Sequence, residues 1–127
     1  MNIEALGKIY QEEGVIHVAQ LFSPVEIEAI REALRRYTEE VVPGLPPNDI
    51  VMEADSVSVR NCWRMEQHDP WFNELTKGES ILALVTHLVA GEPVVMGVES
   101  FNKPARVGSA VPPHQDNAYF CLTPPMP

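Results

Sequence analysis

The sequence predicts an α+β fold in which helices cover one face of a mostly antiparallel sheet. Two segments, residues 24–41 and 80–90, carry apolar side chains at the three- and four-residue spacing of a helix. Shorter segments of β-rich composition follow them, above all residues 94–102. Helices that come before strands in this way indicate the α+β class.

The first full helix is expected to begin at Pro24. Ser23 offers a hydroxyl N-cap, Pro24 suits the first helical position, and Glu26 completes a capping box. An apolar stripe then recurs at steps of three and four, formed by Ile27, Ile30, Leu34, Tyr37 and Val41. Pro43-Gly44 is expected to end the helix, and the β-rich residues 15–20 precede it.

Three further elements are expected before the long β-rich segment. Residues 56–59 alternate as a strand would after the Pro/Gly-rich loop. A short helix is predicted at Asp69-Pro70, with the aspartate as its cap and with Trp71 and Phe72 packed inward. A second full helix over residues 80–90 is closed by Gly91.

Composition and charge narrow the function. A length of 127 residues with 45% hydrophobic content predicts one compact domain, residues 1–127. The formal charge of −9 opposes binding to nucleic acid, and we find neither an apolar run long enough for a membrane nor a signal peptide. Two cysteines, Cys62 and Cys121, are too few for a disulfide framework. A cytoplasmic protein with reduced thiols is the expectation.

The residues His114, Gln115 and Asp116 form the most informative motif of the sequence. Alternate side chains of a strand share a face, so His114 and Asp116 would point the same way and Gln115 the other way. An imidazole and a carboxylate together suit a ferrous site of the 2-His-1-carboxylate type. The alternative interpretation is a surface histidine and aspartate in a turn between prolines.

The residues around this motif resemble the phytanoyl-CoA dioxygenase family. A strand ending in Asn102-Lys103-Pro104 is followed by a Gly-containing loop over residues 105–110, by His-Gln-Asp, and by the aromatic pair Tyr119-Phe120. The resemblance continues at residues 13–18 and 21–24, which look like the opening strand and first helix entry of that family.

This resemblance implies a jelly roll, or partial double-stranded β-helix, with the amino-terminal helices packed on one sheet. It implies iron(II) ligation by His114 and Asp116, 2-oxoglutarate as cosubstrate, and hydroxylation of an unactivated carbon in a small-molecule or acyl substrate with dioxygen. The chain is expected to be the amino-terminal half of such a domain, because no second iron-binding histidine and no cosubstrate arginine follow the motif. Uncovered sheet edges would then allow two copies to pair as a homo-oligomer.

The resemblance also makes four residues candidates for the cosubstrate site: Gln115, Glu99, Lys103 and Arg60. An acid at position 99 departs from the family and would repel a dianion unless it is paired, with Lys103 as the candidate partner. The structural alternatives are an exposed amide for Gln115, an ion pair across the sheet for Glu99, an edge charge for Lys103 and a solvated charge for Arg60. Tyr119 and Phe120 are expected to keep water from the metal, or simply to pack in the core. The other histidines, His17, His68 and His87, are interpreted as structural.

Two rival functions stay open at the level of sequence. One is a non-catalytic binding or assembly domain in which His114 and Asp116 are only a polar pair. The genomic sequence after Pro127 would discriminate, because a downstream histidine followed by an arginine supports the enzyme and a stop codon supports the binding domain. A zinc hydrolase is less well supported, since no His-Glu-x-x-His motif is present.

Overall fold

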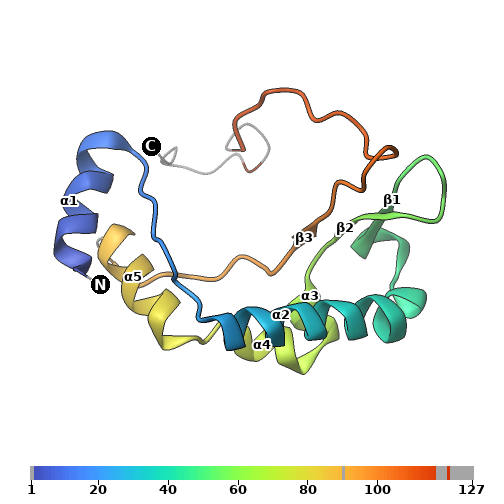
Figure 1. The fold of residues 1–127 in the computed structure, drawn as a ribbon, viewed down its shortest axis with the longest axis horizontal. Coiled ribbons are helices and arrows are strands. Elements are labelled where there is room, and N and C mark those ends of the chain that lie inside the picture. Colours follow the sequence, from blue (N-terminus) through green and yellow to red (C-terminus); the bar gives the residue numbers. More distant parts are fainter. Residues whose placement is uncertain (1, 90, 117–119, 121–127) are drawn as a thin grey trace.

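A computed structural model describes residues 2–89, 91–116 and 120 (Figure 1). This part of the chain combines helices with a small three-stranded antiparallel sheet, which agrees with the expected α+β class. The helices are α1 (Ile3–Glu13), α2 (Pro24–Arg36), α3 (Met65–His68), α4 (Pro70–Leu75) and α5 (Glu79–Val89). The strands are β1 (Ile50–Met52), β2 (Val59–Cys62) and β3 (Ser100–Phe101).

Helix α2 begins where its capping residues predict. The Ser23 hydroxyl accepts a hydrogen bond from the Glu26 amide at 3.3 Å, and the Ser23 amide donates to the Glu26 carboxylate at 2.7 Å. After Arg36 the chain continues through a π-helical turn and a 3-10 turn that ends at Gly44. The predicted stop at Pro43-Gly44 is therefore confirmed, although the last turns are not α-helical.

Helix α1 was not expected from the sequence. The Asn2 side chain caps its start by accepting from the Ala5 amide at 3.1 Å, and Gly14 ends it in the left-handed region at φ 72°. The helix packs against α5, as Figure 1 shows, and Gln11 donates to the Leu88 carbonyl at 3.3 Å. Gly7 permits this approach, because a Cβ atom there would lie 2.5 Å from the His87 ring.

The sheet has the strand order β1-β2-β3. The residues that form its strands differ from three of the segments predicted to be β-rich or strands. Residues 56–58 belong to the turn before β2, where the Asp55 carboxylate accepts from the Ser58 amide at 2.8 Å. Within residues 94–102 only Ser100–Phe101 pair with another strand, and residues 15–20 pair with none in the described part. A β-rich composition favours an extended segment, but a strand of a sheet also requires a neighbouring strand at hydrogen-bonding distance.

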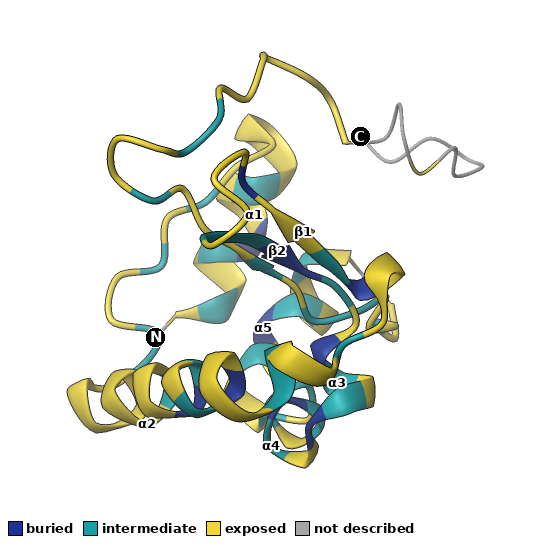
Figure 2. Ribbon diagram, turned by 90° about the vertical axis from the view of Figure 1, so that its right-hand side faces the viewer, coloured by how far each residue is buried: buried dark blue, intermediate teal, exposed yellow. Residues whose placement is uncertain are grey.

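The core lies between the helices and one face of the sheet. Its buried members are Ala33, Tyr37, Cys62, Met65 and Phe72, which come from α2, the π turn, β2, α3 and α4. The Phe72 ring meets the rings of Tyr37 and Trp71 edge-on, with centroids 5.3 and 5.0 Å apart. Figure 2 colours buried stretches of the helices and of β2 dark blue. The inward packing predicted for Phe72 is confirmed, since Phe72 is 2% exposed.

The segment after β3 passes over the other side of the sheet (Figure 1). Two local signals in the sequence before β3 are confirmed by the structure. Asp69 caps α4 by accepting from the Trp71 amide at 2.9 Å, and α5 spans Glu79–Val89, close to the predicted residues 80–90. Ala90, Tyr119, Cys121 and the final prolines lie outside the described residues.

Candidate functional site

The floor of the candidate site is one row of side chains across the sheet. Val51 pairs with Asn61, and Asn61 pairs with Phe101, so these three residues lie side by side. The next row contains Cys62, which is buried in the core. Because neighbouring residues of a strand point to opposite faces, the row of Val51, Asn61 and Phe101 faces away from the core.

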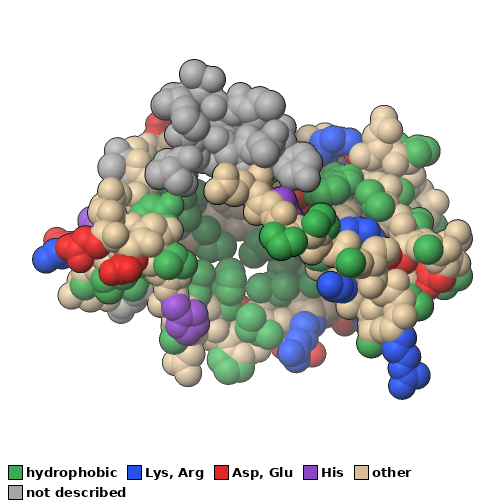
Figure 3. Space-filling view, turned by 90° about the horizontal axis from the view of Figure 1, so that it is seen from above, with side chains coloured by type: hydrophobic (Ala, Val, Ile, Leu, Met, Phe, Trp, Pro, Cys, Tyr) green, Lys and Arg blue, Asp and Glu red, His purple; other side chains and the backbone are tan. Residues whose placement is uncertain are grey.

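A cavity of about 660 Å³ opens over this row. Its remaining lining comes from Arg60 in β2, from Trp63 and Glu99 beside the strands, and from the segment after β3, namely Val111, Pro112, His114, Asp116 and Phe120. From the side opposite α2 and α4 the molecule is hollowed, with hydrophobic side chains lining the hollow (Figure 3). The cavity therefore joins the predicted metal pair to the sheet.

His114 and Asp116 lie close together on the wall of this cavity. The His114 Nε2 atom lies 3.1 Å from Asp116 Oδ1, and His114 Nδ1 lies 2.9 Å from the Pro112 carbonyl oxygen. The prediction that a regular strand carries them is wrong, since residues 111–115 have no assigned strand and Asp116 is in a turn. Proline has no amide hydrogen, so Pro112 and Pro113 cannot donate to a ladder.

The four cosubstrate candidates divide into two groups. Arg60 and Glu99 line the cavity, and the Arg60 guanidinium lies over the Phe101 ring at 5.8 Å from its centroid. Desolvation raises the pKa of Glu99, and the nearby carboxylates of Glu66 and Asp116 raise it further.

Gln115 and Lys103 are not among the residues that line the cavity. Lys103 packs instead against the turn at Gly108, where an added Cβ would lie 2.7 Å from the lysine side chain. Within the described residues Lys103 and Glu99 form no ion pair, so the partnership suggested for them is absent from this structure.

Sequence reasoning missed Asn61 and Trp63 as lining residues, while it named Phe120. Asn61 was missed because a strand placed at residues 56–59 leaves it outside the sheet, whereas Trp63 follows the end of β2. The order Val59-Arg60-Asn61-Cys62 does not alternate between apolar and polar, so the sequence offered no local signal for this strand, and its register depends on which strands pair.

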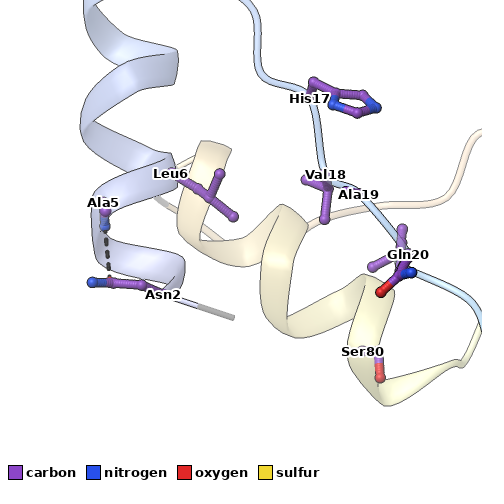
Figure 4. A pocket seen from close by; sticks show the side chains of 9 residues that line it. Asn2, Ala5, Leu6, His17, Val18, Ala19, Gln20 and Ser80 are labelled. Atoms are coloured by element: carbon purple, nitrogen blue, oxygen red, sulfur yellow. Dashed lines mark hydrogen bonds between the residues drawn. The ribbon is translucent and has the colours of Figure 1, made fainter.

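A second apolar hollow adjoins the cavity at Glu99. It has a volume of about 450 Å³ and is lined by α5 residues and by the extended residues 93–99. A separate pocket of about 530 Å³ lies between α1, α5 and the segment that connects α1 to α2 (Figure 4). Its one titratable lining residue is His17, so it offers no counterpart to the pair at the first cavity.

Metal ligation requires several donors, and the described residues supply two at this site. Among residues 2–89, 91–116 and 120, no cluster of three His, Cys, Asp or Glu side chains could hold a metal ion. In the same part of the chain no helix has the length and apolar character to cross a bilayer.

Comparison with known proteins decides the family. Residues 10–127 match the family model described as phytanoyl-CoA dioxygenase. The chain belongs to the phytanoyl-CoA dioxygenase family. No curated protein and no solved structure gives a significant match. Members of this family are typically dioxygenases that use Fe(II) and 2-oxoglutarate and act on small molecules with oxygen, which indicates a place in that oxygenase superfamily.

Proposed function

We propose that this protein acts as a non-haem Fe(II)- and 2-oxoglutarate-dependent dioxygenase that hydroxylates an unactivated carbon of a small-molecule or acyl substrate. The observation that carries the proposal is the 3.1 Å approach of His114 Nε2 and Asp116 Oδ1 on the wall of a cavity in a member of this family. We further propose that the sheet is part of a jelly roll.

The separation of the two donor atoms fits a divalent metal. First-row metals bind nitrogen and oxygen ligands at about 2.1 Å, so two ligands on neighbouring corners of an octahedron lie about 3.0 Å apart. The measured 3.1 Å is close to this value. The carbonyl of Pro112 can accept a hydrogen bond from Nδ1–H of His114, which favours the tautomer whose Nε2 lone pair is available.

Bound iron would activate dioxygen, one atom of which would enter a carbon–hydrogen bond of the substrate, while the other would enter 2-oxoglutarate as it is oxidised to succinate and carbon dioxide. The residues of this chain would bind and orient. In the proposal Arg60 attracts a carboxylate of the cosubstrate. Glu99 lines the same cavity, and burial raises the pKa of its carboxyl. Gln115 and Lys103 remain proposed contacts without support from the cavity lining.

The apolar lining suits a carbon that water must not reach. Trp63, Phe101 and Phe120 present aromatic surface to the cavity, and such surface holds apolar groups. The adjoining hollow at Glu99 offers room for an apolar extension of the substrate.

An anaerobic titration tests the proposal. The protein encoded by the complete reading frame is titrated with Fe(II) and then with 2-oxoglutarate, and the visible charge-transfer band of the chelate is followed. We expect the band in the wild-type protein and in the control His17→Ala, whose histidine lies in another pocket. It should be lost in both His114→Ala and Asp116→Ala, each checked for folding by circular dichroism.

A band retained in either variant removes that residue from the metal site. A wild-type protein without affinity for Fe(II) supports instead the non-catalytic alternative, in which the 3.1 Å contact is only a polar pair.

A further inference from the structure

The loop that leads to the metal pair is fastened to the sheet at both of its ends. At its start, the Asn102 amide donates to the Arg60 carbonyl at 2.7 Å and the Asn102 side chain donates to the Val59 carbonyl at 3.1 Å. At its end, Ser109 donates from both its amide and its hydroxyl to the carboxylate of Glu53. Both anchors connect the loop to the β1-β2 hairpin.

Glu53 is a buried acid, with 4% of its surface exposed. Its backbone is held in the hairpin, because its amide donates to the Ser58 carbonyl at 2.8 Å and its carbonyl accepts from the Ser56 amide at 2.9 Å. Its side chain leaves the hairpin and accepts from the Ser109 amide at 3.1 Å and from the hydroxyl at 2.5 Å. A buried carboxylate is costly unless it is hydrogen-bonded, and charged acceptors make the stronger hydrogen bonds.

The loop between the two anchors is a tight turn. The Gly108 amide donates to the Pro104 carbonyl at 2.8 Å, and a Cβ on Gly108 would lie 2.9 Å from that carbonyl oxygen. Arg106 adopts a left-handed conformation at φ 72°. Because this turn is tight, the positions of Asn102 and Ser109 restrict where the following residues can lie.

Beyond Ser109 the chain reaches the metal pair without strand pairing in the described residues. Between Ser109 and His114 no described residue donates or accepts a hydrogen bond from β1, β2 or β3. In the described part of the chain Ser109 is therefore the last residue before His114 that hydrogen-bonds to the β1-β2 hairpin.

We propose that Glu53 is a positioning residue for the metal site, which holds Ser109 and thereby sets where His114 and Asp116 stand over the cavity. The inference rests on the proposed function. Glu53 would act on the metal site without touching it, since Glu53 is not among the residues that line the cavity.

The same hairpin supplies a matched control. Asp55 also accepts three hydrogen bonds, from the Val57 amide and from the amide and hydroxyl of Ser58, but all of them stay within the hairpin. Asp55→Ala therefore removes a comparable carboxylate without releasing Ser109. The test compares Glu53→Ala, Glu53→Gln, Ser109→Ala and the double variant Glu53→Ala/Ser109→Ala with this control.

Two measurements are made on each variant. The first is the rate of tryptic cleavage after Arg106 in the metal-free protein, which reports the release of the loop. The second is the Fe(II) dissociation constant under anaerobic conditions. We expect Glu53→Ala and Ser109→Ala to cleave faster and to bind Fe(II) roughly tenfold or more weakly, as for other residues that orient metal ligands.

The double variant should resemble each single variant, because both remove one interaction. Glu53→Gln, which keeps an acceptor of the same length, should recover part of the affinity, and Asp55→Ala should match the wild-type protein in both measurements. Faster cleavage with unchanged Fe(II) affinity in Glu53→Ala would overturn the positioning role alone, as would equal weakening by Asp55→Ala. A wild-type protein that does not bind Fe(II) overturns the proposed function and this role together.

Discussion

Replacing Phe72 by alanine should remove a large part of the stability of the fold. The Phe72 side chain is 2% exposed and lies in the cluster that joins α2, β2, α3 and α4. Complete burial of such a ring contributes about 1.5–3 kcal/mol, and each edge-on aromatic pair adds about 0.5–1.5 kcal/mol. With the cavity left by truncation, the expected loss in the free energy of unfolding is about 3–5 kcal/mol.

Urea unfolding followed by far-ultraviolet circular dichroism measures this loss. The matched control is Phe101→Ala, which removes the same ring from a position that is 57% exposed, and we expect it to cost about 1 kcal/mol or less. Native domains are stable by about 5–15 kcal/mol, so Phe72→Ala should move the midpoint strongly toward lower urea without changing the slope. A loss below about 1.5 kcal/mol, or one no larger than that of Phe101→Ala, would refute the assignment of the core.

Two further predictions concern single backbone and charge features. The Arg36 guanidinium, 2.7 Å from Asp69, holds the pKa of this buried carboxyl below its ordinary value of 3.8. The stabilisation of the fold by ionised Asp69 is therefore fully present above about pH 4 to 5 and is lost as the pH falls through the lowered pKa. The difference in unfolding free energy between wild type and Asp69→Asn should be larger at pH 6 than at pH 3. An equal difference at both pH values would contradict the ion pair. Gly14→Ala should cost about 1 kcal/mol in urea unfolding, because its φ of 72° strains any side chain although space is open around it. Gly44→Ala, which is equally open and has no such φ, is the control and should be close to neutral.

Local signals in the sequence predicted two helix starts, although the cap of Asn2 on Ala5 that begins α1 was overlooked. Ser23 with Glu26, and Asp69 with Pro70, mark helix starts because the cap and the amide that it accepts from are close in the chain. The limits of β2 and β3 were misplaced for the opposite reason. Their pairing joins Asn61 to Phe101, and nothing near either residue states that partner.

The sequence by itself determined the family, through residues 10–127, and it placed an imidazole and a carboxylate, His114 and Asp116, two positions apart. This pair is the one proposed to bind iron. Only the tertiary structure decided what surrounds that pair. The row of Val51, Asn61 and Phe101 becomes a cavity floor through cross-strand register, and Glu53 reaches Ser109 through the folding of a loop back onto the hairpin. Such contacts close long loops, so their partners are selected by the packing of the whole core and not by the residues beside them.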